Sequence, residues 1–237
     1  MTSAGAEAVK ENASRIRAGI HAACVRAGRE SHEVRLVAVS KTMPAQAIRW
    51  ARGAGVTDFG ENYVKELVAK AAEVDGVTWH FVGTLQTNTA RHVAQHADVV
   101  HTCVPGGALR RLASRAAERG RSIPALIEVD FTGRRTGVAP EEVLPFADQV
   151  AVLEGVRLAG LMTLPPMPER PEDTRPYFRR LRELRDVLAE LHGTATELSM
   201  GMSMDYDVAV EEGATMVRIG TALFGERPPK DDRLEER

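Results

Sequence analysis

The sequence predicts an α/β protein: a single (β/α)8 barrel, the TIM-type fold, with an extra N-terminal helix. Eight short apolar runs rich in β-branched residues occur along the chain, and a longer stretch of helical periodicity follows each one. The length of 237 residues also suits this fold, for which about 250 residues is typical. The alternative is an open, doubly wound sheet with fewer strands, because residues 56–60 are a short run and residues 196–200 a weak one.

The elements follow one another regularly. Residues 5–28 have apolar side chains at a helical period and end at Gly28, which predicts the N-terminal helix. The expected strands are 34–40, 56–60, 77–83, 97–102, 124–130, 156–162, 196–200 and 215–220. The expected helices are 44–54, 61–74, 86–95, 106–119, 140–153, 172–192 and 205–212, with a last one beginning near Thr221. Glycines after five of these helices predict left-handed caps, at positions 55, 120, 155, 193 and 213.

Composition excludes several classes of protein. The barrel is expected to occupy residues 1–227, and the proline- and charge-rich residues 228–237 to form a tail. A net charge of −2 gives no basic excess for nucleic acid. No apolar run exceeds four residues, so no transmembrane helix is expected. The N-terminus lacks a secretory pattern, and Cys24 and Cys103 are expected to be reduced thiols. These features predict a cytoplasmic protein.

Lys41 is the first candidate site residue. It directly follows the apolar run 34–40, and barrels place their functional side chains at the C-terminal ends of strands. An amine at an apolar barrel mouth loses its proton more easily than one in water, which allows a Schiff base to an aldehyde. The alternative is an ordinary solvated lysine.

The loops after the last two expected strands predict an anion site. Gly201 and Gly220 allow close approach of the backbone, and Ser203 and Thr221 offer hydroxyl groups beside the amides of helix starts. Barrel closure would bring these loops next to Lys41, which suits an aldehyde that carries a phosphate, such as pyridoxal phosphate. The alternative interpretation is that Ser203 only caps the next helix and Gly220 only makes a turn.

Arg218 bears on the chemistry of such a site. Pyridoxal enzymes that use the ring as an electron sink commonly keep its nitrogen protonated with an Asp partner. A guanidinium group only donates hydrogen bonds, so it would leave that nitrogen unprotonated and weaken carbanion chemistry. The alternative is that Arg218 lies in the barrel interior and pairs with a carboxylate of a neighbouring strand.

A zinc site is a further hypothesis. His92 and His96 are four residues apart on an expected helix, and His101 and Cys103 follow. The intervening residues lack the glutamate of a metalloprotease helix. We therefore interpret these histidines as structural or surface residues and expect no metal.

Six segments that span nearly the whole chain carry a family resemblance. They are VAVSKT (37–42), FGENYVKE (59–66), WHFVGTLQTN (79–88), GLMTL (160–164), LSMGMSMDYDVAV (198–210) and VRIGTALFG (217–225). In content and order they resemble the pyridoxal phosphate homeostasis proteins, the YggS/PROSC family. The barrel of that family is similar to the N-terminal barrel of alanine racemase. Two departures are Thr89, where many relatives have lysine, and the loop 130–137, where Arg134 and Arg135 supply the positive charge.

The resemblance implies a role for individual residues. Lys41 would hold pyridoxal 5'-phosphate through a Schiff base, Asn62 would lie at the edge of the cofactor, and Arg218 would face the ring nitrogen. The phosphate end would meet four residues of the late loops: Met202, Ser203, Gly220 and Thr221. His80, near the centre of the third expected strand, is not counted among these residues.

The resemblance also implies a function. The protein would be a monomeric carrier or buffer of pyridoxal phosphate without strong catalytic activity, and pyridoxal-dependent apoenzymes would be its recipients. We expect no second, β-rich domain with a tyrosine for proton transfer, which alanine racemase needs. Two alternatives stay open: an amino-acid racemase or other Schiff-base enzyme that uses the cofactor, and an aldolase-type barrel that uses Lys41 without it.

Overall fold

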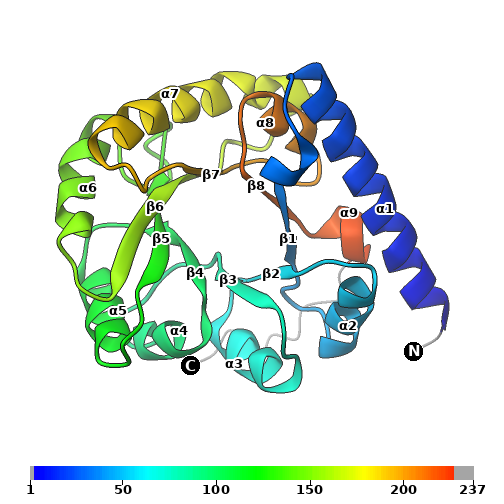
Figure 1. Cartoon of the computed structure of the whole chain (residues 1–237), viewed down its shortest axis with the longest axis horizontal. Helices are drawn as coiled ribbons and strands as arrows, with labels where there is room; N and C mark the ends of the chain where they lie inside the picture. Colours follow the sequence, from blue (N-terminus) through cyan, green and yellow to red (C-terminus); the bar gives the residue numbers. More distant parts are fainter. Residues whose placement is uncertain (1–2, 227–237) are drawn as a thin grey trace.

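Eight parallel strands close into a barrel in chain order, β1 to β8, in the computed structural model, which describes residues 3–226 (Figure 1). The first strand pairs with both the second and the eighth, so the sheet has no open edge. The barrel prediction is therefore confirmed over the doubly wound alternative. The expected tail, residues 228–237, lies outside the described residues.

All eight expected runs form strands, including the short and the weak one. The strands are β1 (Arg35–Val39), β2 (Asp58–Glu61), β3 (Thr78–Phe81), β4 (Val99–Cys103), β5 (Ile123–Val129), β6 (Val156–Thr163), β7 (Glu197–Ser199) and β8 (Met216–Ile219). The helices are α1 (Ser3–Arg26), α2 (Ala45–Gly53), α3 (Val64–Glu73), α4 (Ala90–His96), α5 (Gly107–Ala117), α6 (Val143–Ala151), α7 (Arg175–Leu191), α8 (Tyr206–Glu211) and α9 (Thr221–Phe224). Short 3-10 turns are η1 (Ser31–Glu33), η2 (Pro140–Glu142) and η3 (Pro171–Thr174).

Three local expectations differ from the structure. The third helix begins at Val64 rather than at residue 61, because Glu61 still belongs to β2. The fourth begins at Ala90, after a turn in which the amides of Thr89 and Ala90 both donate to the carbonyl of Gln86. Four of the five glycines expected to form caps have positive φ, but Gly193 does not. There α7 is capped by His192, which has a φ of −128° and a ψ of 83° and whose amide donates to the Leu188 carbonyl.

Strand residues alternate between the barrel interior and the helix layer. On β2, a Cβ added to Gly60 would lie 3.3 Å from Val37 and 3.4 Å from Val39, which are inward side chains of β1. Its neighbour Phe59 belongs instead to the large apolar core, where its ring lies 6.2 Å from that of Trp79. The interior holds a smaller apolar cluster: Val37, Val99, Leu126, Ala159, Met162 and Met216. Polar groups at inward positions are thus enclosed by the strands themselves.

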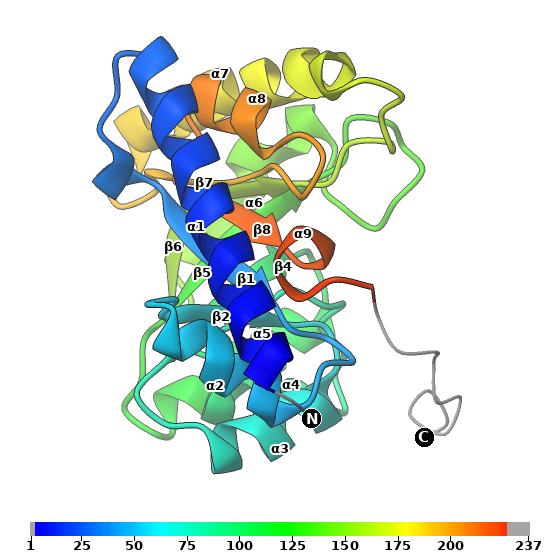
Figure 2. The same ribbon diagram turned by 90° about the vertical axis from the view of Figure 1, so that its right-hand side faces the viewer.

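The expected N-terminal helix forms as α1 and packs against α2, α8 and α9 (Figure 1). Figure 2 shows it along the outside of the barrel, in front of β1. Its contact with α8 is close, since a Cβ at Gly19 would lie 2.2 Å from the Tyr206 hydroxyl oxygen. Both Cys24 on α1 and Cys103 on β4 are buried and form no disulfide. None of the helices in residues 3–226 combines the length and apolar character that a membrane span requires.

Candidate functional site

A cavity of about 790 Å³ opens at the C-terminal ends of the strands. It brings together all the site residues predicted from the sequence: Lys41, Asn62, Met202, Ser203, Arg218, Gly220 and Thr221. Its volume lies within the range of about 300–1,000 Å³ that is usual for small-molecule sites. The site is therefore formed by β8 and by the loops that follow β1, β2, β7 and β8, as barrel closure requires.

The backbone on both sides of Lys41 is fixed by hydrogen bonds. The Ser40 hydroxyl donates to Glu61 Oε1 at 2.6 Å, and the Ser40 carbonyl accepts from Lys70 Nζ at 2.8 Å. The Thr42 amide donates to Glu66 Oε2 at 2.8 Å. Thr42 has a φ of 65°, which a β-branched residue rarely adopts. The surrounding contacts hold this unfavourable conformation directly after Lys41.

Lys70 is the centre of this support, and we call Ser40, Glu61, Glu66 and Lys70 the Lys70 cluster. Lys70 Nζ lies 2.7 Å from Glu61 Oε1 and 2.5 Å from Glu66 Oε2. Burial raises the pKa of Glu61 to about 7, against the lowering effect of Lys70 and Ser40. Within residues 3–226, the second carboxylate oxygens, Glu61 Oε2 and Glu66 Oε1, are buried without a hydrogen-bond partner. The cluster depends strongly on Lys70, because two carboxylates share this one ammonium group.

The two late loops are joined by hydrogen bonds of their own. The Ala222 amide donates to Ser203 Oγ at 3.2 Å, and the Arg218 amide donates to the Gly201 carbonyl at 2.9 Å. Gly201 has a φ of 88°, and a Cβ there would lie 2.5 Å from Ala209 Cβ. The interpretation of Ser203 as a simple helix cap is wrong: α8 begins after Asp205, and Ser203 bonds instead to the start of α9.

Asp205 contributes the acidic group of the cavity. Its Oδ1 accepts a hydrogen bond from the Met202 amide at 2.7 Å, and its side chain is almost fully buried. Burial raises the pKa of Asp205, an effect that the Met202 amide and the charge of Arg218 partly offset. The raised pKa makes this carboxyl group easier to neutralise than an exposed one, which favours an anion nearby.

Arg218 lines the cavity from within the barrel and is 5% exposed. Its Nη1 donates to Ser199 Oγ at 2.5 Å, and its Nη2 donates to the Thr163 carbonyl at 2.9 Å. The expected alternative, an interior arginine paired with a carboxylate, is thus right about position and wrong about the partners. Burial lowers the pKa of Arg218 to about 10, so the guanidinium group stays charged at neutral pH.

Sequence reasoning missed several lining residues. Arg135 adds a third cation beside Lys41 and Arg218, and it was noted only as a positive residue of the loop 130–137. That loop follows β5, so the strand-end rule could have identified it. Three further methionines, Met162, Met167 and Met204, line the cavity beside the predicted Met202. Methionine adapts its shape to irregular apolar surfaces, and it forms a large part of this wall.

His80 lies outside this cavity lining. Its ring bonds to Asp58 at 2.9 Å and to His101 at 2.8 Å, and His101 bonds in turn to Ser199 at 2.8 Å. Both ring nitrogens of His101 are therefore engaged in hydrogen bonds inside the barrel.

Comparison with known proteins shows the family to which the chain belongs. The family model described as alanine racemase, N-terminal domain, matches residues 7–228. The pyridoxal phosphate homeostasis protein of Aquifex aeolicus is 43% identical over 222 residues, which cover 92% of this chain and 97% of the relative. Its counterpart in Escherichia coli K12 is 38% identical over 232 residues, with coverage of 92% and 97%.

Solved structures are similar as well. PipY of Synechococcus elongatus PCC7942, solved with PLP bound, superposes with a TM-score of 0.80 at 36% identity, covering 92% of this chain and 100% of PipY. Alanine racemase of Corynebacterium glutamicum shares the fold, with a TM-score of 0.71 at 17% identity, covering 95% of this chain and 62% of that enzyme. This chain belongs to the alanine racemase N-terminal domain family, in the branch of the pyridoxal phosphate homeostasis proteins.

Proposed function

We propose that this protein binds pyridoxal 5'-phosphate and carries or buffers it in the cytoplasm, without strong catalytic activity of its own. The observation that carries the proposal is the meeting of Lys41 with Ser203, Arg218 and Thr221 in one cavity. The cofactor is an aldehyde with a phosphate and an aromatic ring, and these residues offer an amine, a guanidinium group and hydroxyls. PLP bound to PipY, at 36% identity, supports the same ligand.

Three features of the cavity fit this cofactor. Three cations, Lys41, Arg135 and Arg218, face one acidic side chain, Asp205, which gives a positive balance suited to a phosphate. Val39, Val82 and Met162 offer apolar surface to the ring. Ser203, Gly220 and Thr221 line the same cavity, and two of them offer hydroxyl groups to a phosphate.

Each residue then has a distinct role. Lys41 would hold the cofactor covalently, and the Lys70 cluster would fix the backbone from which its amine extends. Ser203, Gly220 and Thr221 would bind the phosphate, Met202 would contact it, and Asn62 would lie at the cofactor's edge. When bound, pyridoxal phosphate supplies an electron-withdrawing ring for amino-acid chemistry. Arg218, as a donor at the ring nitrogen, would keep that nitrogen unprotonated and so limit such chemistry.

The covalent anchor is tested by labelling. The purified protein is incubated with pyridoxal phosphate, reduced with borohydride, and mapped by peptide mass spectrometry. Lys41→Ala should lose the label and the visible absorbance and keep weak noncovalent binding. Lys65→Ala is the matched control, since Lys65 is exposed on α3, and it should label like the wild type. Full labelling of another lysine in Lys41→Ala would contradict the proposal.

The partners follow from the carrier role. We propose that pyridoxal-dependent apoenzymes receive the cofactor and that the carrier is a monomer. Light scattering should give the mass of one chain, and a loaded protein should activate an apoenzyme faster than Lys41→Ala mixed with the same total cofactor. A dimer mass, or equal activation rates, would overturn these two points respectively.

A further inference from the structure

Five polar side chains form a continuous hydrogen-bonded chain through the barrel interior. Asp58 Oδ1 lies 2.9 Å from His80 Nε2, and His80 Nδ1 lies 2.8 Å from His101 Nε2. His101 Nδ1 lies 2.8 Å from Ser199 Oγ, which accepts from Arg218 Nη1 at 2.5 Å. We call these five residues the interior relay. They come from β2, β3, β4, β7 and β8, so the relay crosses the barrel from wall to wall.

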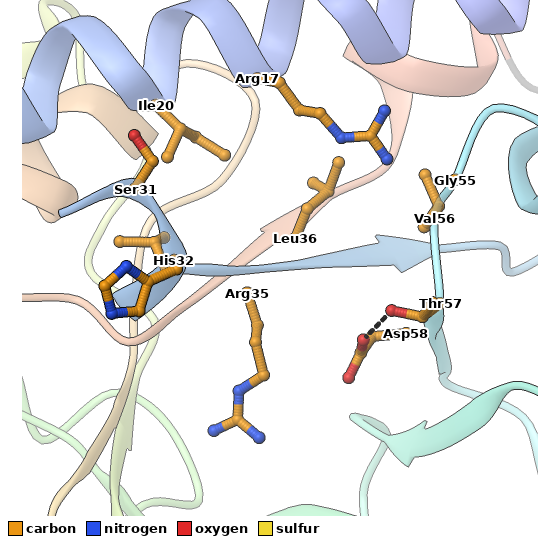
Figure 3. Close-up of a pocket in the computed structure, with 11 residues that line it drawn as sticks. Arg17, Ile20, Ser31, His32, Arg35, Leu36, Gly55, Val56, Thr57 and Asp58 are labelled. Carbon is orange, nitrogen blue, oxygen red and sulfur yellow. Dashed lines mark hydrogen bonds between the residues drawn. The ribbon is translucent and has the colours of Figure 1, made fainter.

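The relay joins two pockets at opposite ends of the barrel. Arg218 lines the cavity at the C-terminal ends of the strands. Asp58 lines a pocket of about 410 Å³ built by residues at the N-terminal ends of β1 and β2. Figure 3 shows that pocket, with Asp58 bonded to the Thr57 hydroxyl and Arg35 projecting from β1. Asp58 is the partly exposed end of the relay, at 13%, whereas His80 is fully buried.

The two ends fix the direction of every hydrogen bond between them. Arg218 can only donate, and the Asp58 carboxylate can only accept. Burial holds the pKa of His101 well below its usual value, so this ring is neutral and carries a single proton. With a neutral His80, each hydroxyl or ring then donates toward Asp58: Ser199 to His101, His101 through Nε2 to His80, and His80 through Nε2 to Asp58. All the groups of the relay are satisfied in this arrangement.

A second arrangement contains one more proton. If His80 takes up a proton from solvent, both of its nitrogens donate, and His101 Nε2 must become an acceptor. The single proton of His101 then lies on Nδ1 and donates to Ser199 Oγ. That oxygen now accepts from both His101 and Arg218, and its own hydroxyl hydrogen turns away. The Ser199 hydroxyl thus no longer donates to His101. This loss weakens Ser199 as an acceptor for Arg218, because hydrogen bonds in a chain reinforce one another.

We propose that Asp58, His80, His101 and Ser199 are positioning residues for Arg218, and that protonation of His80 reverses the relay and loosens the hold on that guanidinium group. The consequence for the cofactor rests on the proposed function, because it requires Arg218 to face the bound ring. A proton taken up at the N-terminal pocket would thereby change the hydrogen bonds of Arg218 at the other end of the barrel.

Other charges around the relay act on its ends. Arg35 of β1 acts on both Asp58 and His101, and Arg218 of β8 acts on His101. Arg218 in turn interacts with Glu128 of β5 and with Asp205. The carboxylates that act on the relay are thus Asp58, which bonds to His80 at one end, and Glu128 with Asp205, which act on Arg218 at the other.

The direct test uses the unliganded protein and does not depend on cofactor binding. Nitrogen-15 NMR of the histidine rings reports tautomer and charge. At about pH 8 we expect His80 and His101 both to carry their proton on Nε2. As the pH falls, His101 should stay neutral and move its proton to Nδ1 at the midpoint where His80 becomes charged. Three results would overturn the proposal. His101 could carry its proton on Nδ1 at about pH 8, or keep it on Nε2 after His80 is charged. His80 could also take up no proton down to about pH 5.

The link to the cofactor site is tested by equilibrium binding across the same pH range. In the wild type, the dissociation constant of pyridoxal phosphate should rise in one step at the pH where His80 becomes charged. Ser199→Ala should raise this constant by about tenfold and remove the step, because Arg218 loses a hydrogen bond. Ser199→Thr, which keeps the hydroxyl, should restore both. His92→Gln on α4 is the control and should behave as the wild type. Unchanged binding in Ser199→Ala would overturn the link, whereas failure of the wild type itself to bind pyridoxal phosphate would instead refute the proposed function and leave the NMR result standing.

Discussion

The two cations of the cavity are supported by contrasting networks. Behind Lys41, the Lys70 cluster holds the backbone with ion pairs at 2.7 and 2.5 Å. Behind Arg218, the interior relay holds a side chain through a hydroxyl and two imidazoles. Short bonds to one buried ammonium group suit a part that must stay fixed. Hydroxyl and imidazole groups can move a proton from one atom to another, which suits a side chain that responds to its surroundings.

The contrast extends to pH. In the Lys70 cluster, burial raises the pKa of Glu61 to about 7, so the folded state binds a proton more tightly than the unfolded state. In the relay, burial lowers the pKa of His101, so the folded state binds a proton less tightly. The contribution of Glu61 to the stability of the folded protein therefore falls as pH rises, and the contribution of His101 falls as pH decreases.

Removing Lys70 should break the contrast most strongly. Lys70→Met leaves Glu61 and Glu66 buried without their shared ammonium group, which should destabilise the protein by about 3–5 kcal/mol. Urea unfolding measures this, with Lys65→Met as the exposed control, expected to change stability by no more than about 0.5 kcal/mol. A loss below about 1 kcal/mol for Lys70→Met would show that the cluster is not held by this charge.

Replacing Glu61 should sharpen the contrast in pH. Its pKa is raised from 4.5 to about 7 in the folded protein, so the wild type should lose up to about 3 kcal/mol between these pH values as pH rises. Glu61→Gln removes the titrating group and should flatten the stability profile in that window. Parallel slopes for the two proteins, from urea unfolding at several pH values, would contradict the assignment.

Replacing His101 should have a smaller effect of opposite sign. The unfolded state protonates its histidine below a pKa of 6.5, while the buried ring resists protonation. The wild type should therefore lose about 1.4 kcal/mol per pH unit below that value from this residue. His101→Gln should remove this part of the acid destabilisation, as seen in thermal unfolding midpoints. A variant with the same acid slope would argue that His101 titrates normally.

The sequence was sufficient for the barrel and for the cavity residues, because both follow local rules. Apolar runs gave the strands, and the strand-end rule placed Lys41, Ser203 and Thr221 together. The relay could not be predicted in this way. His101 and Ser199 are 98 residues apart and meet only through strand register across the barrel.

The Lys70 cluster was missed for a different reason. A lysine on an amphipathic helix is ordinarily solvated, and Lys70 is 7% exposed because Glu61 and the Ser40 carbonyl lie beneath α3. Nor could periodicity locate the start of α4, since the turn at Gln86 uses residues compatible with a helix. Burial of charge depends on tertiary contacts that a single sequence does not display.

A crystal structure of the protein grown with pyridoxal phosphate examines the shared site most directly. We expect electron density joining the cofactor to Lys41 Nζ, with the ring nitrogen toward Arg218 and the phosphate against Ser203 and Thr221. Cofactor density at any other lysine, or a phosphate that lies away from both late loops, would contradict the account.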